Sequence, residues 1–323
     1  MGDFKNELTW SKSRDAIFRD CRRAYYYQHY GSWGGWDMQA PPDVRELYLM
    51  KGLNNRASWP GIVVHEVAER LMRGLQQGRI WPEASALREA EERMRAELQL
   101  SRTGAYRRGQ RVLWAGKRIK TGGLQEHYYQ LPVTDEEWEE TLQHALRCIR
   151  NLYTSSPLRR LLAVGGNALL SVEELESFPV DGIPVWVKLD LAVRGRDGGI
   201  VIVDWKTGAG HVAEDISLQL GIYGLYGMRK WGVGADQIQG FDVNLRDGTL
   251  HRHPIDATIL QQVEAYIQNS IRQMKGCLRD PEANLAERED FPMTDQLDRC
   301  ARCSFRRACD REGSQPPPEP VHV

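Results

Sequence analysis

An acid and a lysine on one side of a strand are the first residues of this chain that could perform chemistry. Residues 201–208 read Val-Ile-Val-Asp-Trp-Lys-Thr-Gly. Because alternate side chains of a strand share a face, Asp204 and Lys206 point the same way where an aliphatic run ends. A carboxylate beside an ammonium group favours a bound metal ion and a polarised water. An isolated pair of this kind is also typical of an edge salt bridge, so the surrounding sequence has to decide.

A second acid precedes this strand. Residues 185–193 alternate, with apolar side chains at the odd positions, and Asp190 faces the other way with its even-numbered neighbours. Residues 194–199 between the two strands contain Arg-Asp-Gly-Gly, which is typical of a hairpin turn. A hairpin brings Asp190 beside Asp204. Two carboxylates and a lysine on adjacent strands predict a site for a hard divalent cation.

Two helical segments can reach the same site. Residues 214–231 have a helical apolar pattern in which Gln219 and Tyr223, four apart, share one face. Far upstream, apolar residues between positions 64 and 75 form a helical stripe that His65 borders. His65 can therefore reach inward to a site.

Together these motifs resemble the RecB-type branch of the PD-(D/E)XK nucleases. The order Gly-x-x-x-His-Glu, strand Asp, Asp-x-Lys-Thr-Gly and Gln-x-x-x-Tyr spans roughly residues 60 to 230. The resemblance implies an α/β fold of the restriction-endonuclease type, with a mixed sheet flanked by helices. It also implies phosphodiester hydrolysis with one or two Mg²⁺ or Mn²⁺ ions. Val187 stands where the family often has glycine, three residues before the strand Asp, so a slightly different backbone approach is expected there.

The resemblance implies a role for each residue of the motifs. The implied metal ligands are His65, Asp190, Asp204 and the backbone carbonyl of Trp205. Lys206 would orient the attacking water and stabilise charge in the transition state. Gln219 and Tyr223 would shape the site or contact the DNA backbone. Glu173, on an earlier strand, is a further candidate, although two other glutamates follow it closely.

The cysteines give an independent signal. Of six cysteines, three form a C-x₂-C-x₅-C cluster near the end of the chain, at positions 300, 303 and 309. Three thiolates are one short of a tetrahedral set, and Cys21 is the best candidate for the fourth. Zinc is an alternative on spacing alone. Disulfides are not expected, because no signal peptide opens the chain and a reducing cytosol is the default. Cys148 and Cys277 lie in helical patterns and are expected to be ordinary buried residues.

One distant N-terminal cysteine followed by this cluster resembles the iron–sulfur nucleases, which include AddB-type helicase-nucleases and the CRISPR-adaptation nucleases. In those proteins a [4Fe–4S] cluster joins the two ends of the nuclease domain. The resemblance therefore implies that the cluster ligands here are Cys21, Cys300, Cys303 and Cys309.

Charge placement indicates more about a partner than net charge does. The 323-residue chain has a net charge of −1 and no run of 18 apolar residues, so no membrane span is expected. Residues 101–125 contain no acid, two aromatic residues (Tyr106 and Trp114) and seven basic ones, which are Arg102, Arg107, Arg108, Arg111, Lys117, Arg118 and Lys120. Such a segment suits single-stranded DNA, because charges pair with phosphates and rings with bases. A solvated loop is the alternative.

One elaborated domain over residues 1–313 accounts for the pattern. Helices are expected over 13–30, 42–53, 61–77, 83–100, 135–153 and 256–278, and strands over 168–178, 185–193, 200–206, 238–245 and 249–253. The helical block near 80–155 is expected to form an insertion over the active-site cleft. Residues 314–323, which contain three consecutive prolines, are expected to be a disordered tail.

The sequence therefore predicts a cytoplasmic, metal-dependent deoxyribonuclease, an exonuclease rather than an endonuclease. It would act on single-stranded DNA or DNA ends in repair, recombination or defence. No Gly-x-x-x-x-Gly-Lys-Ser/Thr loop occurs, so unwinding would require a separate helicase or a CRISPR or phage complex. One alternative is a non-catalytic DNA-binding partner subunit, which the intact set of site residues disfavours. Another is a zinc-stapled nuclease of a defence or mobile-element system.

Overall fold

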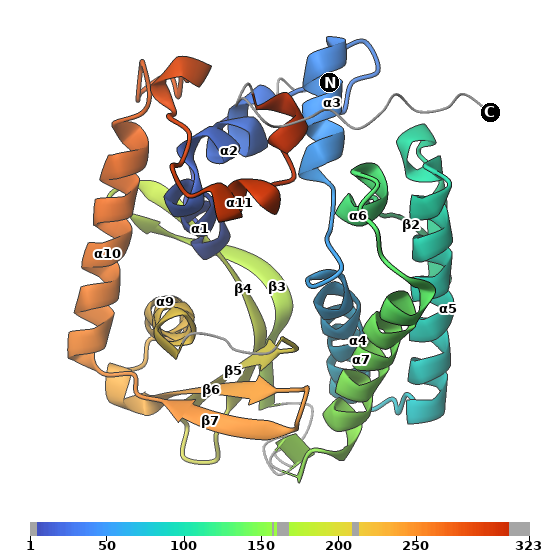
Figure 1. Ribbon diagram of the computed structural model, residues 1–323. Coiled ribbons are helices and arrows are strands. Elements are labelled where there is room, and N and C mark those ends of the chain that lie inside the picture. Colours follow the sequence, from blue (N-terminus) through green and yellow to red (C-terminus); the bar gives the residue numbers. More distant parts are fainter. Residues whose placement is uncertain (1–4, 157, 160–167, 209–212, 310–323) are drawn as a thin grey trace.

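A five-stranded mixed sheet with the order β3-β4-β5-β6-β7 lies at the centre of the computed structural model (Figure 1). The structure describes residues 5–156, 158–159, 168–208 and 213–309. The strands are β3 (Leu169–Val180), β4 (Ile183–Arg194), β5 (Ile200–Lys206), β6 (Ile238–Asn244) and β7 (Thr249–His253). β5 and β6 are parallel, and the other neighbouring pairs are antiparallel. This arrangement confirms the predicted α/β fold with a mixed sheet flanked by helices.

Helices cover both faces of the sheet, as Figure 1 shows. On one side lie α4 (Trp59–Gln76), α5 (Glu83–Arg102) and α7 (Asp135–Thr154), and on the other α1 (Lys12–Asp20), α9 (Ala213–Trp231) and α10 (Ala257–Lys275). Alternate side chains of β5 face opposite sides of the sheet and belong to two separate buried clusters. Val203 and Trp205 pack in one buried cluster with α4 and α7, whereas Ile200 and Ile202 pack in the other with α9 and α10.

The sequence explains why the helix that bears His65 begins and faces as it does. Apolar side chains three and four residues apart on α4, such as Val64, Val67 and Leu71, are buried in the core. Pro60 stands in the first turn of α4, where a missing N–H costs nothing.

α7 begins with a capping box in which Thr134 and Glu137 satisfy each other's backbone N–H groups.

The N-terminal helix expected over residues 13–30 is interrupted at Cys21. The backbone of Cys21 is extended, with φ −161° and ψ 115°, and it separates α1 from the short helix α2 (Arg22–Tyr26) and the following turn η1 (Tyr27–Gly31). The other expected helices and strands begin and end within a few residues of their predicted bounds. They include α3 (Pro42–Lys51).

The basic segment folds into elements that its composition did not indicate. After η2 (Ala105–Arg108), the strands β1 (Arg111–Trp114) and β2 (Lys117–Lys120) form an antiparallel hairpin, followed by α6 (Gln125–Tyr128). Ala115 and Gly116 both have positive φ (50° and 76°), which a two-residue hairpin turn requires.

The two ends of the described chain pack together (Figure 1). Arg23 donates a hydrogen bond of 2.8 Å to the carbonyl of Phe291, and the Tyr27 hydroxyl donates one of 2.9 Å to the carbonyl of Ala308. The described residues after α10 form the short elements η5 (Arg288–Asp290), α11 (Leu297–Ala301) and η6 (Arg306–Ala308). Another short element, η4 (Ala235–Gln237), precedes β6. The tail expected at 314–323 lies outside the described residues. Within the described ranges, no helix is long and apolar enough to cross a membrane.

Candidate metal-binding and catalytic site

A row of acids crosses the sheet at one level. The register between β3 and β4 sets Glu173 opposite Asp190, and the register between β4 and β5 sets Asp190 beside Asp204. Asp242 of β6 is paired directly with Asp204. Side chains in direct register share a face of the sheet. The strands therefore gather buried carboxylates that are far apart in the sequence.

His65 closes one end of this row. Its Nδ1 lies 3.0 Å from Glu173 Oε1 and 3.2 Å from Asp190 Oδ1. One ligand atom from each of the three residues lies within 4.8 Å of the others. Both carboxylates are buried, and the imidazole is 31 % exposed. Two oxygen donors and one nitrogen donor at this spacing form a suitable set for a divalent cation.

The charge of His65 depends on the two acids beside it. Burial lowers the pKa of His65, but the charges and hydrogen bonds of Asp190 and Glu173 outweigh burial and raise this pKa well above its usual value. The protonated imidazole thus offsets part of the negative charge of the two acids. A metal ion bound to the same atoms would displace that proton, so binding and proton release are coupled.

The backbone fixes Asp190 for such a role. The N–H of Trp205 donates a hydrogen bond of 2.6 Å to Asp190 Oδ2, which leaves Oδ1 toward His65. Burial opposes ionisation of Asp190, but the positive charge of His65 lowers its pKa below the usual value. Asp190 is therefore a carboxylate with one defined oxygen, Oδ1, on the side of His65.

Lys206 is held by contacts from two elements. Its Nζ lies 2.5 Å from Asp204 Oδ2 and donates a hydrogen bond of 3.0 Å to Gln219 Oε1 on α9. Gln219 Nε2 donates to the hydroxyl of Tyr223 at 2.8 Å, and that hydroxyl donates to the carbonyl of Lys188 at 2.9 Å. The helical pair inferred from a spacing of four therefore connects the lysine to the backbone of β4. Burial and the charge of Asp190 raise the pKa of Asp204 to about 7.

The fold and the site coincide with one protein family. A family described as the PD-(D/E)XK nuclease superfamily matches residues 9–310. The chain belongs to the PD-(D/E)XK nuclease superfamily. No protein with a curated description matches the chain. A solved structure titled "Crystal structure of SSO0001" is similar at 15% identity and a TM-score of 0.29, over 55% of this chain and 78% of that chain.

Membership of the PD-(D/E)XK superfamily indicates a metal-dependent nuclease. Glu173, the weakest candidate in the sequence, lies in the group of ligand atoms with His65 and Asp190. Its φ of 51° is in the left-handed region, which is uncommon for a residue other than glycine and is typical of functional positions. No motif of the sequence pointed to Lys188, whose Nζ lies 2.6 Å from Glu173 Oε2. Its place two residues before Asp190 was the available signal.

A buried ion network holds α4, and with it His65, against the neighbouring helix. Arg93 of α5 is 3 % exposed and donates hydrogen bonds to both Glu66 and Glu97. Its Nε lies 2.8 Å from Glu97 Oε1. Trp59 Nε1 donates to the second oxygen of Glu97 at 2.5 Å. Because Glu66 follows His65 directly, this network fixes the position of the imidazole.

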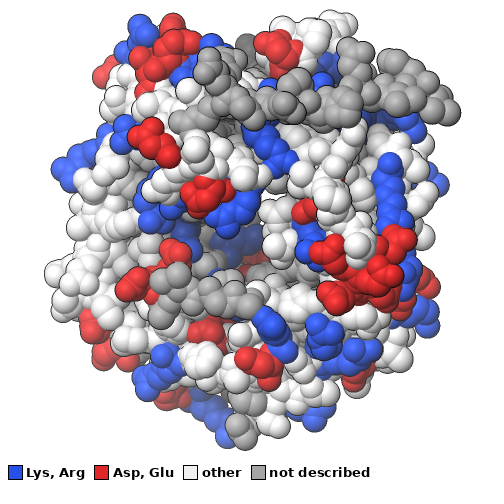
Figure 2. Space-filling view, viewed as in Figure 1, with Lys and Arg blue, Asp and Glu red and all other residues white. Residues whose placement is uncertain are grey.

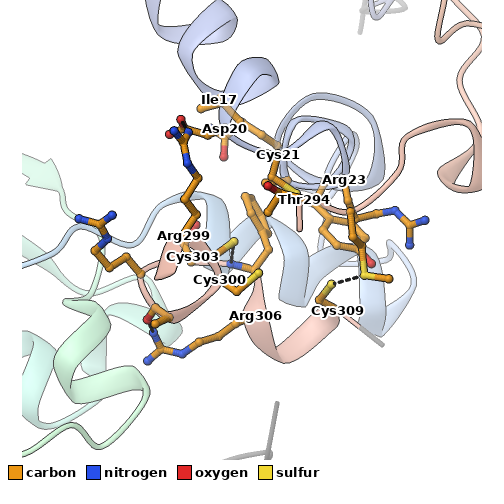
Figure 3. Close-up of a pocket in the computed structure, with 18 of the residues that line it drawn as sticks. Ile17, Asp20, Cys21, Arg23, Thr294, Arg299, Cys300, Cys303, Arg306 and Cys309 are labelled. Carbon is orange, nitrogen blue, oxygen red and sulfur yellow. Dashed lines mark hydrogen bonds and ion pairs between the residues drawn. The ribbon is translucent and has the colours of Figure 1, made fainter. Parts of the chain in front are cut away.

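The four cysteines proposed as ligands line one cavity of about 740 Å³ between the two ends of the chain (Figure 3). Cys21 comes from the break between α1 and α2, and the others come from α11 and the loops around it: Cys300, Cys303 and Cys309. Burial raises the pKa of Cys303 to about 11, and the other three cysteines add to this effect. Cys148 and Cys277 are buried in the two cores beside the sheet, as expected.

The basic segment divides into exposed and packed residues. Arg107 pairs with Glu46 at 3.9 Å and lies over the ring of Tyr128. Trp114 is only 8 % exposed and lies under the guanidinium of Arg93, so its ring does not face solvent. All seven basic residues are exposed, and two of them, Arg102 and Arg107, pair with Asp135 and Glu46. The hairpin thus presents charge and keeps its ring in the core.

Proposed function

We propose that this chain is a metal-dependent deoxyribonuclease of the RecB-type branch. The observation that carries the proposal is the convergence of His65, Glu173 and Asp190 next to the Asp204–Lys206 pair. Carboxylate and imidazole donors suit Mn²⁺ or Mg²⁺, and a fixed ammonium group suits the charge that develops on a phosphate during hydrolysis.

The residues that would hold one or two divalent ions are His65, Glu173, Asp190, Asp204 and the backbone carbonyl of Trp205. A bound divalent ion would supply a water of lowered pKa and neutralise charge on the phosphate. The donor set fits such an ion in two respects. Asp190 keeps one oxygen for it, and the buried Oδ2 of Asp204 has no hydrogen-bond partner besides its ion pair with Lys206.

Lys206 would act on the substrate directly. In hydrolysis, the oxygen of water forms a bond to phosphorus and the bond to one bridging oxygen breaks, so that one product carries a phosphate and the other a hydroxyl. Lys206 would orient that water and donate to a non-bridging oxygen. Because Asp204 and Gln219 already fix its ammonium group, little reorganisation is needed as charge develops.

The decisive experiment measures cleavage of end-labelled DNA by the purified protein with Mg²⁺ or Mn²⁺. Single strands should be degraded, EDTA should stop the reaction, and Lys206→Ala should lower the rate by roughly two orders of magnitude or more while DNA binding survives. Lys230→Ala is the matched control, because it removes an exposed lysine of α9 that pairs with Glu176 away from the site. Wild-type protein that binds DNA but cleaves neither single strands, ends nor flaps would favour a non-catalytic partner subunit.

The preferred substrate in this proposal is single-stranded DNA or a DNA end, cut as an exonuclease. The support is the charge exposed by the β1–β2 hairpin and its flanks, which is available to phosphates but offers no ring for base stacking. Unwinding would depend on a separate helicase or a CRISPR or phage complex, in DNA repair or defence. A single nuclease domain over residues 1–313 would include the hairpin and its helices as an insertion.

We further propose that Cys21, Cys300, Cys303 and Cys309 hold a [4Fe–4S] cluster that ties the chain ends together. A single zinc ion at about 2.3 Å from each thiolate draws its sulfur ligands to roughly 3.8 Å of one another. In the described part of the chain, no group of three or more potential ligand atoms within 4.8 Å includes a cysteine. The wider spacing and the large cavity favour a cluster over one zinc ion.

Protein prepared without oxygen tests this assignment. It should be brown, with absorption near roughly 400 nm and about four iron and four sulfide per chain. Cys21→Ser should remove the colour and lower the Tm, because the cluster closes a very long loop. Cys148→Ser is the control and should keep the colour. Stoichiometric zinc without iron would refute the cluster and leave the four ligands in place.

A further inference from the structure

A lysine of the N-terminal helix lies close to the Lys206 contacts. Lys12 Nζ is 3.9 Å from Asp215 Oδ1, in the first turn of α9. Asp215, Gln219 and Tyr223 are spaced by four, so they follow one face of that helix. Because Gln219 accepts the hydrogen bond of Lys206, Lys12 lies about one helical turn from it, on the same face.

Pairing with β4 also positions the segment just before Lys12 near the candidate site. Trp10 forms a bridge with Val185 of β4, and its carbonyl accepts a hydrogen bond of 2.7 Å from the N–H of Trp186. β4 then continues to Lys188 and Asp190. Figure 2 shows a hollow at the centre of this side of the molecule, with Lys and Arg atoms at its rim and in its depth, in the region where Figure 1 has β3 and β4 beside α1.

Stability does not explain the position of Lys12. A cation in the first turn of a helix opposes the helix dipole. Its partner Asp215 is 55 % exposed and is shared with Arg19 at 4.0 Å, so the ion pair contributes little. Burial lowers the pKa of Lys12, and its side chain is only 26 % exposed. The charges of Asp204 and Lys206 also act on that pKa, which agrees with a position beside the site.

We propose that the ammonium group of Lys12 binds a phosphate of the substrate strand next to the scissile phosphate. This rests on the proposed function, because it requires a nucleic-acid strand in the site. Lys206 and Lys188 are paired with site carboxylates at 2.5 and 2.6 Å. Lys12 is paired instead with Asp215, which is not one of the site carboxylates and lies 3.9 Å from its Nζ. A phosphate can therefore replace Asp215 as the partner of Lys12. Lys12 is thus a substrate-binding residue that acts without metal.

Binding of a single-stranded oligodeoxynucleotide in EDTA, measured by anisotropy over a series of salt concentrations, tests the proposal. Lys12→Gln should weaken binding about five- to tenfold at low salt and reduce the slope of log affinity against log salt by about 0.7, because one phosphate contact is lost. Lys12→Arg should restore both values. Lys12→Ala is a second neutral variant, with a high helix propensity, if Lys12→Gln lowers the Tm.

Arg19→Gln is the matched control on the same helix. The substitution removes the same charge as Lys12→Gln does. Arg19 also contacts Asp215, but its guanidinium is bound to Asp15 at 2.9 Å and lies over the ring of Tyr266. We expect it to leave affinity and salt slope unchanged. Asp215→Asn should tighten binding about twofold in the presence of Lys12 and have no effect in the Lys12→Gln background.

Several results would overturn the assignment of Lys12. Unchanged affinity and slope in both neutral variants would do so, as would a wild-type protein that binds no single strand. A lower kcat with unchanged binding would place Lys12 in the chemistry instead. Wild-type protein that binds strands through Lys12 but never cleaves them would refute the nuclease proposal and support this one.

Discussion

Replacing Asp204 with asparagine should remove a loss of stability that the metal-free protein shows as the pH rises. Burial, and then the charge of Asp190, raise the pKa of Asp204 from 3.8 to about 7. Between these values the folded state binds a proton that the unfolded state does not. The free energy of unfolding therefore falls as the pH rises from about 4 to about 7, and the loss is complete above that.

The magnitude follows from the two pKa values. Each pH unit between them corresponds to about 1.4 kcal/mol, so ionisation of the folded state at Asp204 costs roughly 4 kcal/mol. About 3 kcal/mol of this is lost between pH 5 and pH 8. Asp204 is only 1 % exposed, so solvent screening does not reduce the effect. In a chain of 323 residues, 3 kcal/mol corresponds to about 4 °C in Tm.

The assay compares the Tm of wild type and Asp204→Asn in EDTA at pH 5 and pH 8. The gain in Tm of the variant over wild type should be about 4 °C larger at pH 8. Mn²⁺ should stabilise wild type more than the variant, because the ion binds the carboxylate in the folded state only.

Asp242→Asn is the control for a buried acid at the same level of the sheet. Its two oxygens are bound by His253 at 2.5 Å and His251 at 3.2 Å, so the variant should lose stability at both pH values. An equal difference between wild type and Asp204→Asn at pH 5 and pH 8 would refute the reasoning, since the charge of Asp204 would then cost nothing.

Two further outcomes test the metal group and the hairpin. Glu173→Gln should weaken Mn²⁺ binding at least tenfold in calorimetry, because it removes one of three converging donors, and an unchanged Kd would exclude Glu173 as a ligand. Replacing both Arg111 and Lys117 with alanine should lower the salt slope of single-strand binding by about 1.4, since both residues are exposed. Arg102→Ala should leave that slope unchanged, because Arg102 pairs with Asp135. Equal slopes in the double variant and in wild type would show that the hairpin is only a solvated surface.

The strand pattern was enough to predict that Asp190 and Asp204 lie side by side. Period-two alternation and a Gly-rich turn bring Asp190 to Asp204, and a spacing of four places Gln219 and Tyr223 on one helix face. These are local rules, so one sequence contains them. Local rules also located the apolar stripe beside His65.

Tertiary contacts determined the rest. Three glutamates lie within four residues of β3, so the sequence alone did not single out Glu173; its backbone, at φ 51°, and its register with Asp190 distinguish it. Lys12 lies at the N-terminus of α1 and has no motif in common with Lys206, so only the packing of α1 near α9 connects them. The break at Cys21 follows no helix-breaking residue; the segment meets the C-terminal cysteines there.

The packing of the first helices against the last segment has a consequence for synthesis on the ribosome. Tyr25 stacks on Phe291, and the Tyr27 hydroxyl donates a hydrogen bond to the carbonyl of Ala308, so neither contact exists until residues 291 and 308 have been translated. At about 5–20 residues per second, the stretch between them takes on the order of 14 to 56 s to emerge. During that interval the aromatic side chains of the N-terminal helices remain uncovered, and they are an expected binding site for a chaperone. The four cysteines that line the cavity between these segments can likewise come together only late, once the residues up to Cys309 have been translated.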